Sequence, residues 1–173
     1  MTLDVNEKWG QLVKAATAFL KEHDFNTART KLLEALETID TTEGQSSSWK
    51  SFHNGYACDE FLNQFVVQFY KAERSMYASY ADLAIFVGTK AVFDDGHQSQ
   101  FTLTRLFDIA TELSHEPSTK DVSMQLFELA YLQQAKATST QEALRKIDVC
   151  QQIAQADFSD EFYDKLRHLA GAV

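Results

Sequence analysis

The segment 57–93 constrains the fold more than any other part of the chain, because its apolar residues recur at the spacing of a helix. One row runs along it in steps of three and four residues: Phe61, Phe65, Phe69, Ala72, Met76, Tyr80, Leu83 and Val87. A second row lies beside the first: Leu62, Val66, Tyr70, Tyr77 and Ala84. A helix that is apolar over two neighbouring rows is usually central in its domain. The sequence therefore predicts a long central helix with other helices packed against two of its sides.

A single straight helix over 57–93 would be roughly 54 Å long at about 1.5 Å per residue, which exceeds the width of a compact domain of this size. The sequence indicates two places for a bend or a break. One is a polar patch that comprises Lys71, Glu73, Arg74 and Ser75. The other is Gly88, because a glycine inside a helix costs about 1 kcal/mol relative to alanine.

The rest of the chain is also predicted to be mostly helical. Apolar periodicity predicts a short last helix from Ser159 and further helices over 5–22, 25–39, 99–114, 119–136 and 141–156. A single proline and six glycines in 173 residues suit a helical protein, and the alternation that a sheet requires is absent. We predict an all-α single domain over 1–173, an array or bundle of about seven antiparallel helices.

The segment 41–54 is predicted to be a mobile loop, because it is rich in serine and low in apolar residues. Trp49 and Phe52 are its two aromatic residues. They are expected to fold back on the core, with contact to a partner as the alternative.

The charge of the chain limits the kind of partner it can bind. The formal net charge is −9, from 25 acidic and 16 basic residues, and a phosphate backbone requires a basic face. We therefore expect no nucleic-acid partner. No basic and apolar signal segment begins the sequence, and no stretch approaches the roughly 18 apolar residues of a spanning helix. The expectation is a cytoplasmic protein with no membrane partner.

Two short runs resemble a known repeat family. The first run comprises Leu12, Ala15, Ala16 and Phe19, a turn at His23, Asp24 and Phe25, and then Ala28, Leu32 and Ala35. It resembles one tetratricopeptide repeat, in which small residues let two paired helices approach closely. A weaker copy comprises Phe127, Ala130, Tyr131, Ala143, Ile147 and Cys150. The distance between the copies does not fit a regular tandem array, and any short helical hairpin with alanines at its crossing could give the same pattern.

The resemblance implies a groove, formed by the first helix of each pair, that receives a peptide or a helix. Its exposed inner positions would be Val13, Thr17 and Lys21, and in the weaker copy Glu128, Leu132 and Lys136. These positions lack the residues with which some such repeats bind a terminal carboxylate. The resulting hypothesis is a non-enzymatic interaction module, acting as an adaptor, chaperone or regulatory subunit that binds a protein or peptide. Whether copies of the chain form a homo-oligomer is left open.

No strong motif for a metal, cofactor or phosphate appears in the sequence. The best metal candidate combines Asp94, Asp95 and His97, since carboxylate and imidazole groups suit divalent ions. Three nearby polar residues fix no coordination geometry, however, and are typical of a turn that ends a helix. We therefore predict no metal and no cofactor.

His53, Cys58 and Asp59 provide the residue types of a base, a nucleophile and an orienting group. Cysteine catalysis also requires an activated thiolate and a site for the oxyanion, and no loop for the second is visible. Cys58 and Cys150 both lie at apolar helical positions, which favours buried structural thiols. The sequence therefore predicts a protein that is not an enzyme.

A second hypothesis comes from the aromatic residues of the predicted central helix. Phe65, Phe69, Tyr77 and Tyr80 could line an apolar pocket, which would make the protein a ligand-sensing helical bundle. Aromatic rows at helical spacing usually form a packed core instead. A ligand pocket would need a cavity of at least roughly 300 Å³ beside these rings.

Overall fold

The computed structural model describes residues 5–40, 47–90, 100–137, 139–153 and 156–171, with side chains for 7–39, 53–90, 104–132, 135, 139–152 and 156–171. All regular structure in these ranges is helical, which confirms the predicted all-α class. The helices are α1 (Val5–Lys21), α2 (Phe25–Asp40), α3 (Ser47–Lys71), α4 (Tyr77–Lys90), α5 (Gln100–Leu113), α6 (Lys120–Ala137), α7 (Thr140–Ile153) and α8 (Asp160–Gly171). Two short 3₁₀ helices, η1 (Arg74–Met76) and η2 (Pro117–Thr119), precede α4 and α6. No described helix is both long and apolar enough to cross a membrane.

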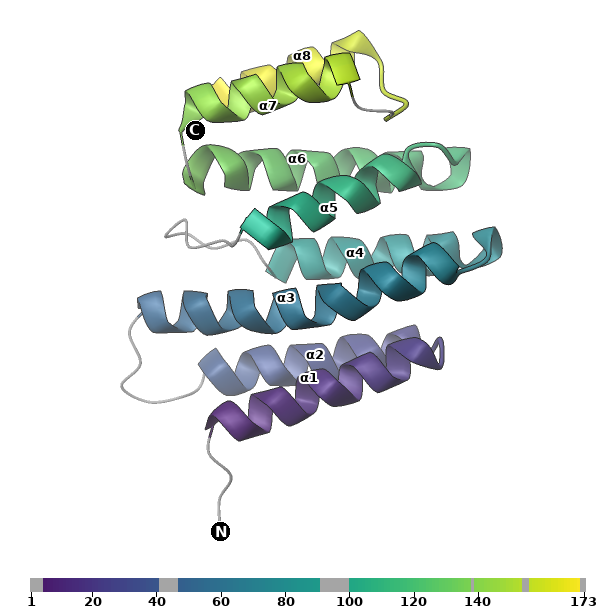
Figure 1. Cartoon of the computed structure of the whole chain (residues 1–173), viewed down its shortest axis with the longest axis vertical. Coiled ribbons are helices and arrows are strands. Elements are labelled where there is room, and N and C mark those ends of the chain that lie inside the picture. Colours follow the sequence, from purple (N-terminus) through teal and green to yellow (C-terminus); the bar gives the residue numbers. More distant parts are fainter. Residues whose placement is uncertain (1–4, 41–46, 91–99, 138, 154–155, 172–173) are drawn as a thin grey trace.

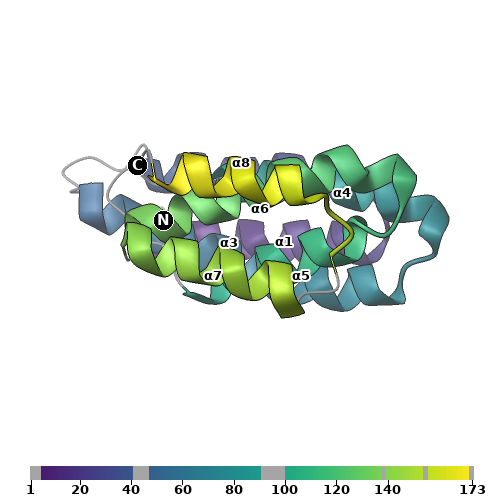
Figure 2. The same cartoon turned by 90° about the horizontal axis from the view of Figure 1, so that it is seen from above.

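The helices form two layers that lie one behind the other, and within each layer the helices stack along the long axis of the molecule (Figure 1). The first layer holds α1, α3, α5 and α7, and the second layer, drawn fainter behind it, holds α2, α4, α6 and α8. Contacts between α1 and α3 and between α3 and α5 join the first layer, while α2, α4, α6 and α8 contact one another in that order. The view from above shows α8, α6 and α4 on one side and α7 and α5 on the other (Figure 2). Consecutive helices therefore pair as hairpins, and the hairpins stack.

The long central helix expected over 57–93 is not one helix in the structure, because the chain reverses direction inside it. Helix α3 ends at Lys71 and α4 begins at Tyr77. The break lies in the predicted polar patch, whose residues 73–75 are exposed, and Gly88 stays inside α4. Folding α4 back on α3 lets the two halves of the apolar stripe bury each other: the ring centroids of Phe65 and Tyr80 lie 5.4 Å apart.

The loop predicted over 41–54 is wrong from residue 47 on, because α3 begins at Ser47. The periodicity was hidden there by serines, which are polar but tolerated in a first helical turn. The segment 41–46 lies outside the described residues, as do the side chains of Trp49 and Phe52. The expectation for these two aromatic residues therefore stays a prediction.

Small residues set the close approach of α1 and α2. Ala16, Ala28 and Ala35 are fully buried, and Leu20 and Leu32 fill the space between the two helices with no exposed surface. The turn between the helices is tight: the Asp24 N–H donates to the Phe19 carbonyl at 2.9 Å. These are the positions on which the tetratricopeptide resemblance depends.

Buried hydroxyls join α5 to α6 and to the segment before α8. Thr119 Oγ1 donates to the Leu113 carbonyl at 2.8 Å, and Ser123 Oγ donates to the Ala110 carbonyl of α5. Ser114 Oγ accepts a hydrogen bond from the Asp157 N–H at 3.0 Å, which attaches the segment before α8 to the end of α5. Each of these bonds satisfies a buried polar group at a helix end.

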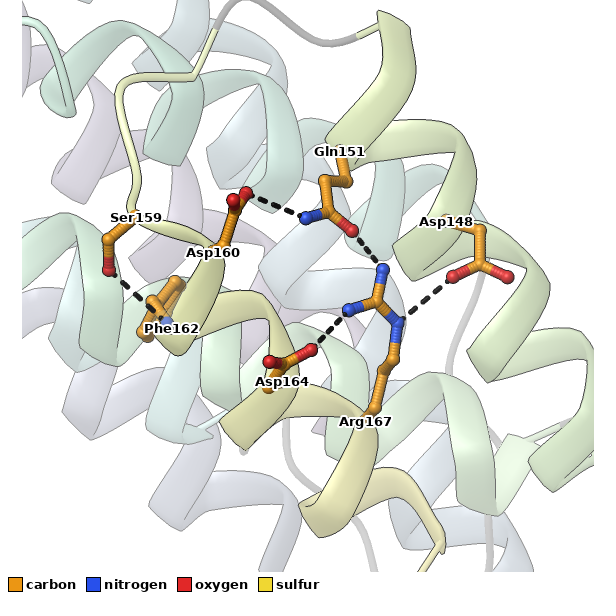
Figure 3. A network of polar contacts seen from close by, with 7 residues as sticks. All are labelled: Asp148, Gln151, Ser159, Asp160, Phe162, Asp164 and Arg167. Carbon is orange, nitrogen blue, oxygen red and sulfur yellow. Dashed lines mark hydrogen bonds and ion pairs between the residues drawn. The ribbon is translucent and has the colours of Figure 1, made fainter.

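A network of charged side chains holds α8 against α7 (Figure 3). Arg167 Nε lies 3.0 Å from Asp148 of α7, and its Nη1 lies 2.8 Å from Asp164 of α8. The third guanidinium nitrogen donates to the side-chain carbonyl of Gln151, whose amide in turn donates to Asp160 at 2.9 Å. Every nitrogen of the Arg167 guanidinium is therefore bonded, and two of the three bridge α8 to α7.

Candidate interaction site

The site is a cleft of about 450 Å³ between α1 and α3. From α1 it is lined by Val13, Lys14, Thr17, Ala18 and Lys21. From α3 it is lined by Glu60, Asn63 and Gln64. The two helices form its walls because each buries its large apolar residues in the core and leaves its polar and small residues along the seam.

A second cleft of about 630 Å³ continues the first toward the start of α1. The two share Lys14 and Glu60, so they form one groove along the helix pair. The rings of Trp9 and Tyr56 meet edge to face across it with centroids 6.1 Å apart, and Tyr56 remains 52% exposed. At Gly10 an added Cβ would find nothing within 4 Å, so this wall of the groove is open.

The two lysines of the cleft have no carboxylate partner among the residues that the structure describes. Lys14 and Lys21 are exposed, and neither takes part in an ion pair with any residue that the structure describes. Glu60 lies on the opposite wall and likewise forms no ion pair within the described ranges. Helix α1 has three lysines against one glutamate, in a chain of net charge −9. The groove wall formed by α1 is therefore basic on an acidic protein.

Exposed apolar residues gather beside this groove. Among the described side chains, the exposed large hydrophobic ones are Tyr56, Val67 and Tyr70 on α3 and Val149 on α7. All four belong to the first layer, and the three on α3 share one stripe with Glu60 and Asn63 of the cleft. Partial burial raises the pKa of the Tyr70 hydroxyl, and the carboxylates of Glu112 and Asp108 on α5 add to the rise. The outer face of the first layer therefore combines apolar side chains with unpaired charge.

The structure brings together one of the two predicted sets of partner-binding residues. Val13, Thr17 and Lys21 line the same cleft. Val13 is only 2% exposed and so forms its floor, while the Thr17 hydroxyl donates to the Val13 carbonyl at 3.0 Å. The predicted α1 positions thus lie together, and two of the three remain accessible.

The other predicted set lies on α6, in the second layer, and does not face the cleft. Glu128 is bound to Lys165 of α8 at 2.6 Å, Leu132 is half-buried, and the side chain of Lys136 lies outside the described residues. The reason is that the chain reverses direction at Lys71–Ser75, where the sequence indicated only a bend or a break of the long helix. With the rod counted as one helix, α6 becomes the first member of a pair with α7, whereas in the structure it is the second member of a pair with α5.

The sulfur of Cys58 does not have the properties of a nucleophile. Its side chain is fully buried, and burial, followed by the nearby Asp59 carboxylate, raises the pKa of the thiol to about 12. His53 has its ring edge-on to Trp9, with centroids 6.5 Å apart. A thiolate at Cys58 is therefore disfavoured at neutral pH.

The remaining candidate groups do not form a second site in the described part of the chain. No cluster of three or more metal-binding side chains occurs there, while Asp94, Asp95 and His97 lie outside the described residues. Phe65, Phe69 and Tyr80 are at most 1% exposed and pack ring against ring, and they line neither of the two clefts. These aromatic residues are core.

Sequence reasoning missed the α3 wall of the cleft. Lys14 could have been found from its seven-residue spacing to Lys21, but Glu60, Asn63 and Gln64 gave no signal until α3 was placed beside α1. No protein-family model, curated protein or solved structure matches this chain. The candidate site is therefore defined by its own geometry.

Proposed function

We propose that this protein is a non-enzymatic helical interaction module that binds a protein or peptide in the groove between α1 and α3. The observation that carries the proposal is the distribution of exposed apolar side chains, which among the described residues are confined to the first layer. Three of them lie on α3, the helix that forms one wall of the groove. Exposed apolar groups beside a cleft are typical of a surface that a partner covers.

A degenerate tetratricopeptide-like architecture is part of the same proposal. Hairpins stacked in two layers, with buried alanines where α1 crosses α2, support it. In such an arrangement the first helices of the pairs present a common face, which here would extend from α1 across α3 to α5. An adaptor, a chaperone and a regulatory subunit would all use a face of this kind.

A cytoplasmic setting and a macromolecular partner other than nucleic acid complete the proposal. The two cysteines, Cys58 and Cys150, are free, as is usual where thiols stay reduced. A net charge of −9 opposes binding to phosphate backbones.

The test is affinity capture from the source cells with the double variant Thr17→Glu and Lys21→Glu. We expect a partner that wild-type protein retains and the double variant loses, because both substitutions place carboxylates in the cleft. Lys71→Glu is the matched control, since Lys71 is exposed on α3 but does not line the cleft. Unfolding midpoints of all three proteins establish that each is folded, and capture that is equal for wild type and double variant would contradict the proposal.

A further inference from the structure

The charges of the groove restrict what can fill it. Lys14 and Lys21 lie on one wall of a single cleft, both exposed and neither ion-paired with any residue in the described part of the chain. Elsewhere the acidic surface repels an acidic molecule, so this wall is where negative charge is best accommodated. The complement of two unpaired lysines is a pair of carboxylates.

The spacing of the two lysines restricts the shape of the occupant. They are seven residues apart on a helix, which is about 10.5 Å along its axis. A second helix laid alongside α1 repeats the same side of its surface every seven residues, so acidic side chains at positions i and i+7 would meet both lysines. An extended strand repeats its faces at about 6.8 Å and would match only one of the lysines well.

The walls of the groove allow a helix to come close. Gly10 and Ala18 lie on the α1 side, where Gly10 has free space above it and Ala18 is exposed. Glycine inside a helix costs stability, and small residues at such positions permit close approach of another backbone. A ridge of apolar side chains from the occupant would rest over the nearly buried Val13.

We propose that the occupant of the α1–α3 groove is an amphipathic helix of a partner protein, with an apolar ridge and an acidic pair seven residues apart that contacts Lys14 and Lys21. This inference rests on the proposed function and specifies the partner's chemistry. The opposite flank of that helix faces Asn63, Gln64 and Glu60, so it carries polar side chains, with a basic residue opposite Glu60. The ion pairs formed are partly desolvated by the groove and set the register of the helix.

The test uses a display library of helical peptides of about 18 residues, roughly 27 Å long, with apolar ridge positions fixed and both flanks randomised. Peptides are selected on the wild-type chain and sequenced. We expect enrichment of Asp or Glu at two positions seven residues apart. The double variant Lys14→Glu and Lys21→Glu should bind the selected peptides at least about tenfold more weakly, and the loss should shrink as salt is raised.

Two matched variants separate charge from occupancy. Lys8→Glu with Lys71→Glu changes the net charge by the same amount at exposed lysines that line neither cleft, and should leave binding unchanged. Ala18→Trp fills the cleft without changing charge, and should abolish binding. A selected peptide with its acidic pair changed to lysines should bind the Lys14→Glu and Lys21→Glu variant better than wild type does.

Three outcomes would overturn the inference. Peptides that lack an acidic pair but lose binding to the Ala18→Trp variant would show a groove with a different ligand, which leaves the proposed function intact. If none of the selected peptides depends on Ala18 for binding, the result contradicts both the inference and the proposed function. Self-association of the wild-type chain in sedimentation, lost in Ala18→Trp, would identify the occupant as a second copy of this chain.

Discussion

The two ends of the helical stack use their charged residues in opposite ways. At the C-terminal end, Arg167 joins α8 to α7 and Lys165 joins α8 to α6, so the cations are used inside the fold. At the N-terminal end, Lys14 and Lys21 line an open groove, and no ion pair between described residues joins α1 to another helix. Charge stabilises the last hairpin, whereas in the first hairpin it is available to a partner.

The difference has a physical basis in the packing of the two hairpins. Helices α1 and α2 meet over fully buried alanines and leucines, so apolar contact alone can hold them. Helices α7 and α8 contact each other less extensively than α1 and α2 do, although α8 buries Phe162, Tyr163, Leu166 and Ala170. Where two helices share a smaller contact, polar bonds across their seam contribute a larger part of what joins them.

The largest expected effect is on the apolar packing of the first hairpin. Leu32→Ala should lower the free energy of unfolding by about 2–5 kcal/mol, because Leu32 has no exposed surface and its removal leaves a cavity. Urea denaturation measures this change. Since no charge is involved, the loss should be the same in low and high salt, and a strong salt dependence would contradict the proposed division between the two ends.

The two cysteines provide a second comparison, through pH. In the folded chain the pKa of Cys58 is about 12, whereas in the unfolded chain the thiol ionises near 9.0. Between these values the unfolded chain binds fewer protons, so the free energy of unfolding should fall as the pH rises, by at most about 1.4 kcal/mol per pH unit. Below pH 9 the contribution is constant.

Urea denaturation of wild type and Cys58→Ala at pH 8, 9 and 10 tests this expectation. The variant should lose less stability above pH 9 than wild type does, since all other titrating groups are shared. Cys150→Ala is the control: burial also raises the pKa of Cys150, but its hydrogen bond with Tyr131 opposes the rise, so its slope should change less. Equal slopes for wild type and Cys58→Ala would mean that Cys58 is accessible to solvent.

Arg167→Met should lower the free energy of unfolding by about 1 kcal/mol, because the variant keeps the apolar stem and loses the bridge between α7 and α8. The loss should diminish in high salt, since Asp148 and Asp164 are largely exposed. Arg145→Met is the matched control within α7, because its ion-pair partner Glu142 lies on the same helix, so this pair does not bridge two helices. A loss for Arg145→Met as large as that for Arg167→Met would show that the bridge is not what stabilises α8.

The sequence was sufficient to predict most helices, because each carries its own apolar periodicity. The polar patch at Lys71–Ser75 indicated a place for a break, but not that the chain reverses there, since the apolar stripe continues across it without a change of step. Glycine and proline, the usual signals of a reversal, are absent from that patch. A periodic pattern shows which residues are buried, but not whether they face a common neighbour or each other.

That one ambiguity determined which part of the site could be predicted. The α1 positions precede the break, so they were placed correctly relative to one another. The α6 positions follow it. Because the sequence analysis counted one helix too few before α6, it placed α6 in the first layer, whereas the structure has α6 in the second layer. The α3 wall of the groove depends on the parallel placement of α1 and α3, a contact between distant residues that no local pattern encodes.

The smallest expected effect is a gain in stability at the turn of the first hairpin. His23 has a φ of 62°, in the left-handed region that glycine adopts without cost, and its N–H donates to the Leu20 carbonyl at 3.0 Å. His23→Gly should raise the free energy of unfolding by about 0.5–1 kcal/mol, less any contribution from the ring contact with Phe25 at 6.2 Å.

His23→Ala should not raise the free energy of unfolding, because alanine keeps the backbone strain and loses the ring. Thermal unfolding of the three proteins distinguishes these effects, and an Ala variant as stable as the Gly variant would mean that backbone strain does not limit this hairpin. A stabilised turn should leave peptide binding unchanged, since His23 does not line the groove, whereas substitutions at Lys14 and Lys21 should alter binding and leave stability nearly unchanged.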